Sequence, residues 1–153
     1  MFSFTIYDLL EKNLPNRADH PALILGDTQL NYGELAKQVN KMAAWLHKHG
    51  VRRGDRIGIC FPRSFEEVIA TFASARIGAI FVNINHQWKL FQFQHVIEDC
   101  GIRILLTDRQ KAREIEKSGL IHLFDHVVVQ GKTFEHPKVT PWANLLETPL
   151  TTL

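Results

Sequence analysis

A repeated alternation in the middle of the chain limits the possible folds more than any other feature of the sequence. Short apolar runs alternate with longer amphipathic stretches, which predicts strand, helix, strand, helix and strand at residues 56–60, 64–76, 79–83, 89–99 and 103–107. The runs are almost continuously apolar, which suits parallel strands whose two faces are both covered. We therefore expect an α/β fold, a parallel sheet with helices on both faces.

The residues before this repeat predict a small β-hairpin between two helices. The first helix is expected at about residues 6–13, and the hairpin joins residues 21–25 to residues 28–30. Gly26 opens the hairpin loop, where glycine permits a positive φ at little cost. Asn31 and Glu34 have the spacing of a capping box, so the second helix should begin there and end near Gly50.

The residues after the repeat first continue it and then lose the pattern. A charged helix is expected at residues 109–117 and a fourth parallel strand at residues 126–130. Three prolines then interrupt the chain, and proline lacks a backbone N–H donor. We therefore divide the chain into an α/β subdomain at residues 1–131 and an irregular tail at residues 132–153, with one short turn at residues 142–146.

Composition and charge remove several classes of protein. The 153 residues suffice for one domain with a core, and 45% hydrophobic with 22% charged residues is typical of soluble globular proteins. The net charge of +2 favours neither nucleic acid nor an anionic membrane as a partner. No apolar run approaches the ~20 residues of a membrane span, and the N-terminus lacks the features of a signal peptide. We expect a cytoplasmic protein without a membrane span.

Cysteines and histidines give no clear metal site. Cys60 and Cys100 have no C-x-x-C partner, which excludes a four-cysteine zinc site and a disulfide framework, so both are interpreted as buried apolar residues. His122 and His126 have the i, i+4 spacing of metal ligands on a helix. His126 opens a strand-like run, however, so packing in a loop or at the surface is favoured over metal binding.

The loops that follow the predicted strands are poor in catalytic groups, although parallel sheets bind ligands there. No glycine-rich phosphate-binding motif occurs. Ser64 is interpreted as a helix cap rather than a nucleophile, because Glu67 completes a capping-box pattern. Arg52, Arg53 and Arg56 form a basic turn that we interpret as solvated charge, with an anion contact as the alternative. We therefore predict no catalytic residue.

Four stretches carry motifs in a recognisable order. They are Pro21-Ala-Leu with Leu30-Asn-Tyr-Gly-Glu-Leu35, Gly50-Val-Arg-Arg-Gly-Asp-Arg-Ile-Gly58, Ser74-Ala-Arg-Ile-Gly-Ala-Ile-Phe-Val82 and Ile97-Glu-Asp-Cys-Gly-Ile-Arg-Ile-Leu-Leu-Thr-Asp108. Together they resemble the beginning of the AMP-forming acyl-CoA synthetases, adenylation domains and luciferases. The resemblance covers about residues 6–108. Within it, residues 85–107 look most like small acyl-CoA ligases associated with exosortase systems.

Two departures from the pattern of that superfamily lie close together. Its members usually have proline where Asn83 stands, and N-P-R-L or N-P-L-L where this chain has Asn85-His-Gln-Trp88. In relatives that ligate CoA, the arginine of N-P-R-L lies near a CoA phosphate, and Gln87 cannot supply that charge. Lys89 is the candidate substitute. Gln87 and Lys89 are therefore the candidate CoA contacts that the resemblance implies, with solvated loop residues as the alternative interpretation.

The resemblance implies that the chain is the N-terminal part of a longer ATP-dependent carboxylate ligase. The parent enzyme would use ATP with Mg²⁺ to form an acyl-adenylate from a carboxylic acid, and would transfer the acyl group to CoA or a carrier thiol. Its phosphate loop, acyl pocket and catalytic lysine would follow Leu153. The fragment itself is then expected to hold no cofactor, to be inactive, and to have the remainder of the ligase chain as its partner.

Two other functions stay open at this point. The chain could be a stand-alone interaction or small-molecule-binding module with the same fold and no catalysis. It could also be an unrelated flavodoxin-like binder of a nucleotide or a flavin. Apolar faces that would rest on the missing remainder should be exposed in a free fragment, so we expect self-association.

Overall fold

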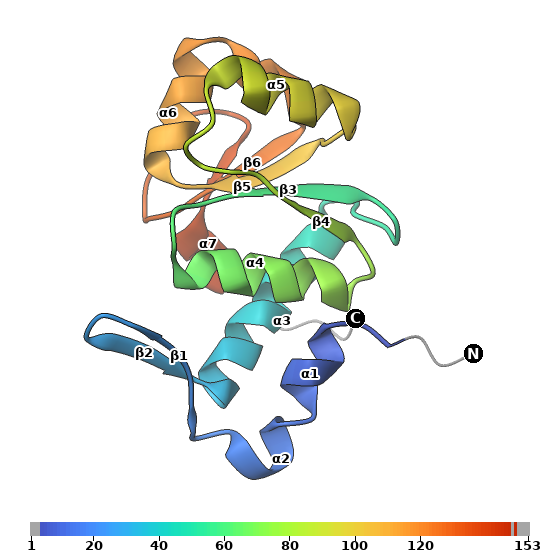
Figure 1. The fold of residues 1–153 in the computed structure, drawn as a ribbon, viewed down its shortest axis with the longest axis vertical. Helices are drawn as coiled ribbons and strands as arrows, with labels where there is room; N and C mark the ends of the chain where they lie inside the picture. The colour runs from blue at the N-terminus through green and yellow to red at the C-terminus, as the bar shows by residue number, and fades with distance from the viewer. Residues whose placement is uncertain (1–3, 148, 150–153) are drawn as a thin grey trace.

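A five-stranded, all-parallel sheet forms the centre of the computed structural model, which describes residues 4–147 and 149 (Figure 1). The order across the sheet is β4-β3-β5-β6-β7. The strands are β3 (Arg56–Cys60), β4 (Ile80–Asn83), β5 (Ile104–Thr107), β6 (His126–Val129) and β7 (Val139–Pro141). The predicted α/β class and the four predicted parallel strands are confirmed.

Helices cover both faces of this sheet (Figure 1). One face lies against α3 (Tyr32–Lys48), α4 (Phe65–Arg76) and α7 (Trp142–Leu146), and the other against α5 (Leu90–Asp99), α6 (Arg109–Lys117) and the short 3-10 helix η1 (Leu120–Leu123). Alternate strand residues serve the two cores. In β5, Ile104 and Leu106 belong to the first cluster, whereas Leu105 belongs to the second. Burial on both faces explains why the strands are continuously apolar.

The N-terminal elements agree with the sequence except in the first helix. The hairpin of β1 (Pro21–Leu25) and β2 (Thr28–Asn31) is antiparallel, and Gly26 has a φ of +58°. Asn31 and Glu34 form the reciprocal capping box that begins α3. The helix expected at residues 6–13 is present but shorter, as α1 (Tyr7–Glu11). A separate helix that was not predicted, α2 (Leu14–Arg17), follows it, and Pro15 lies in its first turn, where a missing N–H costs no hydrogen bond.

The expected tail also needs a correction. Residues 139–141 form the edge strand β7, paired in parallel with β6, and α7 follows it directly. Trp142 and Leu145 are buried in the core that α3 and α4 share, and Lys41 Nζ donates a hydrogen bond to the Leu146 carbonyl. A three-residue strand is too short to show a period, and an edge position tolerates Pro141. Residues 148 and 150–153 of the expected tail lie outside the described residues, and the proposed domain boundary stays a prediction.

Several large apolar side chains remain on the surface. Ile24 of β1 and Phe91 of α5 are each 69% exposed, and Ile80 of the edge strand β4 is 48% exposed. Among the described residues, no helix combines the length and the apolar character that crossing a membrane requires. These three residues lie on three separate elements, and the expected self-association stays a prediction that their exposure motivates.

Candidate functional site

The candidate site lies beyond the carboxyl ends of β4 and β5, where loop 84–89, which follows β4, approaches the start of α6. Open parallel sheets bind their ligands at this end of their strands. A hollow of about 460 Å³ opens there, and its lining residues are His86, Gln87, Trp88, Lys89, Leu90, Gln110, Lys111 and Glu114. The structure therefore brings both candidate CoA contacts to one hollow, together with charged residues that the sequence did not single out.

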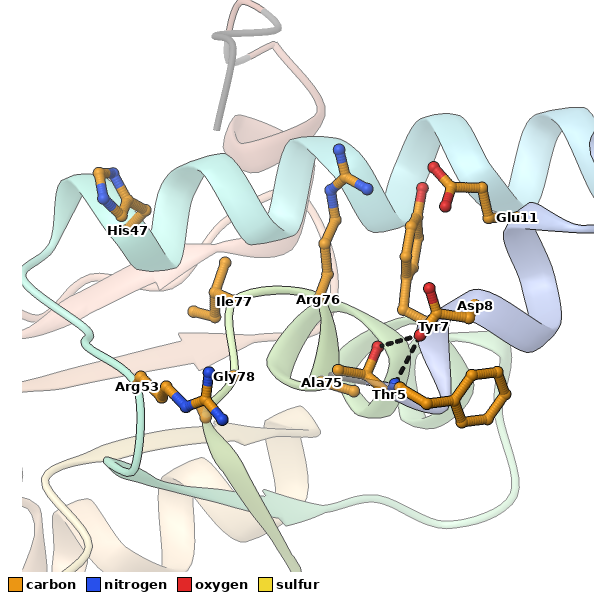
Figure 2. A pocket seen from close by; sticks show the side chains of 12 residues that line it. Thr5, Tyr7, Asp8, Glu11, His47, Arg53, Ala75, Arg76, Ile77 and Gly78 are labelled. Carbon is orange, nitrogen blue, oxygen red and sulfur yellow. Dashed lines mark hydrogen bonds between the residues drawn. The ribbon is translucent and has the colours of Figure 1, made fainter. Parts of the chain in front are cut away.

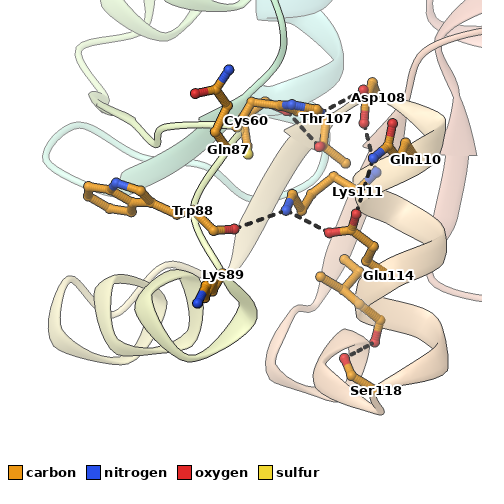
Figure 3. Close-up of polar contacts among 12 residues, drawn as sticks. Cys60, Gln87, Trp88, Lys89, Thr107, Asp108, Gln110, Lys111, Glu114 and Ser118 are labelled. Carbon is orange, nitrogen blue, oxygen red and sulfur yellow. Dashed lines mark hydrogen bonds and ion pairs between the residues drawn. The ribbon is translucent and has the colours of Figure 1, made fainter.

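A buried lysine forms part of the lining of this hollow. Lys111 is 3% exposed, and its Nζ donates hydrogen bonds to Glu114 Oε2 at 2.7 Å and to the Trp88 carbonyl oxygen at 3.4 Å (Figure 3). The ammonium also lies 5.8 Å from the centre of the Phe93 ring. The hydrogen bond from Lys111 lowers the pKa of Glu114. The cation thus has two oxygen partners and one aromatic neighbour, as a buried charge requires.

Asp108 links the same loop to the first turn of α6. It is the N-cap of α6, and its Oδ1 accepts the Lys111 backbone N–H at 2.8 Å. Its second oxygen, Oδ2, lies 2.8 Å from His86 Nε2, which donates to it. One buried carboxylate therefore both starts the helix and binds the loop.

Gln87 and Lys89 are exposed on the rim of the hollow. Their side chains leave the loop in different directions in Figure 3, on either side of Trp88. The Gln87 N–H donates to Asn85 Oδ1 at 2.9 Å, and the Lys89 N–H donates to Gln92 Oε1 at 3.1 Å. Both side chains are free to meet a ligand, and the CoA contact stays a prediction.

The thiol of Cys60 lies behind this site and is buried. Burial raises its pKa to about 12, an effect that the nearby Lys111 charge only partly opposes. Thr107 Oγ1 donates to the Cys60 carbonyl oxygen at 2.7 Å and ties β5 to the end of β3. A thiol that stays protonated at neutral pH is a poor nucleophile, which agrees with the interpretation of Cys60 as an apolar core residue.

A larger hollow, of about 710 Å³, lies at the other end of the strands, their amino ends (Figure 2). It opens before the start of β4, between α1 and the ends of α3 and α4. Arg76 places its guanidinium 4.4 Å from the centre of the Tyr7 ring, and Arg53, Asp8 and Glu11 also line the hollow. Acidic and basic groups are mixed there and the position is at the amino ends of the strands, so size alone does not make it the functional site.

The other candidate residues from the sequence cap helices or lie apart from the candidate site. Ser64 Oγ accepts the Glu67 N–H at 3.2 Å as the N-cap of α4, and the reciprocal Glu67 bond of a capping box is absent among the described residues. Arg52 donates from its guanidinium to the Val51 and His47 carbonyl oxygens at the end of α3. His122 lies in η1 and His126 in β6. Within residues 4–147 and 149, no group of three or more His, Cys, Asp or Glu could hold a metal ion.

Sequence reasoning missed His86, Asp108 and Lys111. Asp108 had a local signal, because an aspartate directly before a charged helix is a good N-cap. Lys111 had a weaker one, since it stands beside Ala112 on the face of α6 that is buried. The contact between His86 and Asp108 had none, because it depends on how loop 84–89 packs on α6.

The comparison with known proteins decides the family. Residues 10–148 match the family model described as AMP-binding enzyme. This chain belongs to the AMP-binding enzyme family. A curated relative is the medium/long-chain-fatty-acid–CoA/3-oxocholest-4-en-26-oate–CoA ligase of Mycobacterium marinum, 31% identical over 113 residues, which are 74% of this chain and 20% of the relative. Another is bacitracin synthase 2 of Bacillus licheniformis, 30% identical over 132 residues, which are 84% of this chain and 5% of that protein.

A solved member of similar fold is the anthranilate CoA ligase AuaEII in complex with anthranoyl-AMP. The TM-score is 0.89 at 28% identity, and the match covers 98% of this chain and 29% of the ligase. The chain thus spans a small part of each of these relatives. It corresponds to one α/β segment of each of them, and the reaction of a whole member of the family is a matter for proposal.

Proposed function

We propose that this chain is the N-terminal part of an ATP-dependent carboxylate ligase that acts through an acyl-adenylate. The observation that carries the proposal is the match of residues 10–148 to the AMP-binding enzyme family. The likeness to AuaEII supports it, because nearly the whole chain has a counterpart in a ligase that was solved with an acyl-adenylate, anthranoyl-AMP.

The proposed reaction has two steps. A carboxylate oxygen attacks the α-phosphorus of ATP, the bond to the β-phosphate bridging oxygen breaks, and acyl-adenylate and pyrophosphate form. A thiol, from CoA or a carrier, then attacks the acyl carbon, loses its proton, and releases AMP. ATP with Mg²⁺ and the thiol acceptor are the cosubstrates of the longer enzyme. This chain contributes the parallel sheet and its covering helices.

Loop 84–89 is the part of this chain that we assign to the thiol acceptor. Lys89 is exposed beside the hollow and carries a positive charge on a flexible side chain. Gln87 can donate or accept hydrogen bonds there but cannot neutralise a phosphate. Lys89 would therefore provide the charged contact with a CoA phosphate, and Gln87 a neutral one.

ATP–pyrophosphate exchange with a panel of carboxylic acids tests this function. It should be measured for the 153-residue chain and for the longest polypeptide that its gene encodes, each with an acid-free control. We expect no acid-dependent exchange from residues 1–153 and clear exchange from the longer polypeptide. Exchange by the short chain, or a gene that ends at Leu153, would show that the proposal is wrong.

The alternative, a stand-alone binding module, makes a different prediction for the same short chain. Such a module should bind a nucleotide, a flavin or CoA saturably by itself. Titration calorimetry with ATP, FMN and CoA separates the two functions. The ligase proposal expects no saturable heat with FMN, and only weak binding of ATP or CoA because most of the enzyme is missing.

A further inference from the structure

Two residues of loop 84–89 are held by the first turn of α6, one on each side of Gln87. His86 donates to Asp108 Oδ2 at 2.8 Å, and the Trp88 carbonyl oxygen accepts from Lys111 Nζ at 3.4 Å. The loop is also fixed at its start, where the Ile84 N–H donates to the Ile59 carbonyl oxygen at 2.8 Å. Gln87 and Lys89 are therefore exposed side chains on a backbone with several anchors.

The burial of Lys111 needs a reason beyond the stability of α6. Position 111 is on the buried side of that helix with Ala112 and Ile115, where an apolar side chain would avoid the cost of removing an ammonium from water. The charge is nevertheless retained, and among the described residues its one hydrogen bond outside its own helix goes to the Trp88 carbonyl (Figure 3). Glu114, three residues further along α6, accepts the other hydrogen bond of the Lys111 ammonium.

We propose that Lys111 and the His86–Asp108 pair are positioning residues, which hold loop 84–89 in the shape that presents Gln87 and Lys89 to the thiol acceptor. This inference rests on the proposed function. The two anchors come from one helix turn, so they hold positions 86 and 88 at a fixed spacing. If either of the two were removed, residues 86–89 could rotate about the anchors that remain, and both rim side chains would lose their orientation.

Amide hydrogen exchange on the chain itself tests the anchoring without any ligand. The probes are the amides of Gln87, Trp88 and Lys89, each of which donates a hydrogen bond in the structure. We expect them to exchange about tenfold faster in Lys111→Met and in His86→Ala, and His86→Gln to restore part of the protection because it keeps an N–H donor. Lys117→Met, an exposed lysine of the same helix, should leave the three rates unchanged.

Steady-state kinetics of the longer polypeptide test the role. Lys111→Met should raise the KM for CoA in thioester formation about tenfold while acid-dependent pyrophosphate exchange stays at the wild-type rate. Equal losses in both reactions, or loop amides that exchange at the wild-type rate in folded Lys111→Met and His86→Ala, would overturn the inference. If the wild-type polypeptide shows no pyrophosphate exchange, the proposed function fails, whereas the amide rates still decide whether the loop is anchored.

Discussion

His49 and His126 meet edge to face at the amino end of the sheet, with ring centroids 4.8 Å apart and an angle of 82° between their planes. His49 also stacks on Trp45, with centroids 3.7 Å apart, and its Nδ1 lies 2.8 Å from the Trp45 carbonyl oxygen. Burial, followed by the His49 charge, lowers the pKa of His126 from its ordinary value of 6.5. The folded chain therefore disfavours a proton on His126.

This pair predicts a loss of stability in mild acid. The pKa of His126 is lower in the folded than in the unfolded state, so protonation favours the unfolded chain. The free energy of unfolding is therefore unaffected by His126 above pH 6.5 and decreases as the pH falls below that value. Urea unfolding at about pH 7.5 and about pH 5 measures the loss. His126→Gln should lose less stability than wild type, and His95→Gln, an exposed site on α5, should lose as much. Equal losses in all three would contradict the prediction.

Replacement of the buried lysine should change stability little. In Lys111→Met the stem stays packed, and Glu114, whose side chain is 37% exposed, can be solvated instead of being left as a buried charge. We expect a change in the free energy of unfolding below about 1 kcal/mol. NMR titration of the Glu114 carboxyl should show its pKa rising toward the ordinary value in the variant, because the hydrogen bond that lowers it is gone. An unfolded variant would contradict this prediction.

The two cysteines should differ in reactivity. Cys60 is 0% exposed and its pKa is raised to about 12 by burial, whereas Cys100 is half-buried. Native chain treated with a thiol reagent near neutral pH should be modified at Cys100 and not at Cys60. Mass spectrometry before and after unfolding in urea reports each site. Fast labelling of Cys60 in the folded chain would show that the interior opens there.

Gly58 is required by close packing. A Cβ at this position would lie 3.1 Å from Ile102 Cγ2 and 3.1 Å from Leu105 Cδ1, inside the second core cluster. We expect Gly58→Val to destabilise the chain by about 2–3 kcal/mol, measured by urea unfolding. Gly33→Ala is the matched control, because its Cβ would meet no atom closer than 3.4 Å and alanine favours a helix. A neutral Gly58→Val would mean that the two side chains can move away.

Self-association should depend on the exposed apolar residues. Phe91 on the outer helix α5 and Ile80 on the edge strand β4 are both large and exposed. The double variant Phe91→Lys with Ile80→Lys should therefore associate less than the wild-type chain. Sedimentation velocity over a range of concentrations measures this. A wild-type chain that stays monomeric at high concentration would remove the basis for the expectation.

Local signals account for the parts of the fold that could be predicted. The cap made by Asn31 and Glu34, the turn at Gly26 and the strand at residues 56–60 each depend on residues within a few positions of one another. Pro15 in the first turn of α2 follows the same kind of local rule, but four residues are too few to show a helical period, so α2 was not predicted. The short strand β7 had too few residues for a period.

The sequence by itself determined the order of strands and helices, which of their faces are apolar, and where most of them begin, because those properties arise from contacts between near neighbours. Only the tertiary structure decided that β7 completes the sheet beside β6, and that His86 and Trp88 rest on Asp108 and Lys111. Those partners are far apart in the chain, and they meet because the burial of two apolar faces sets the positions of β4, β5 and their loops. Packing, which no local pattern records, therefore built the candidate site.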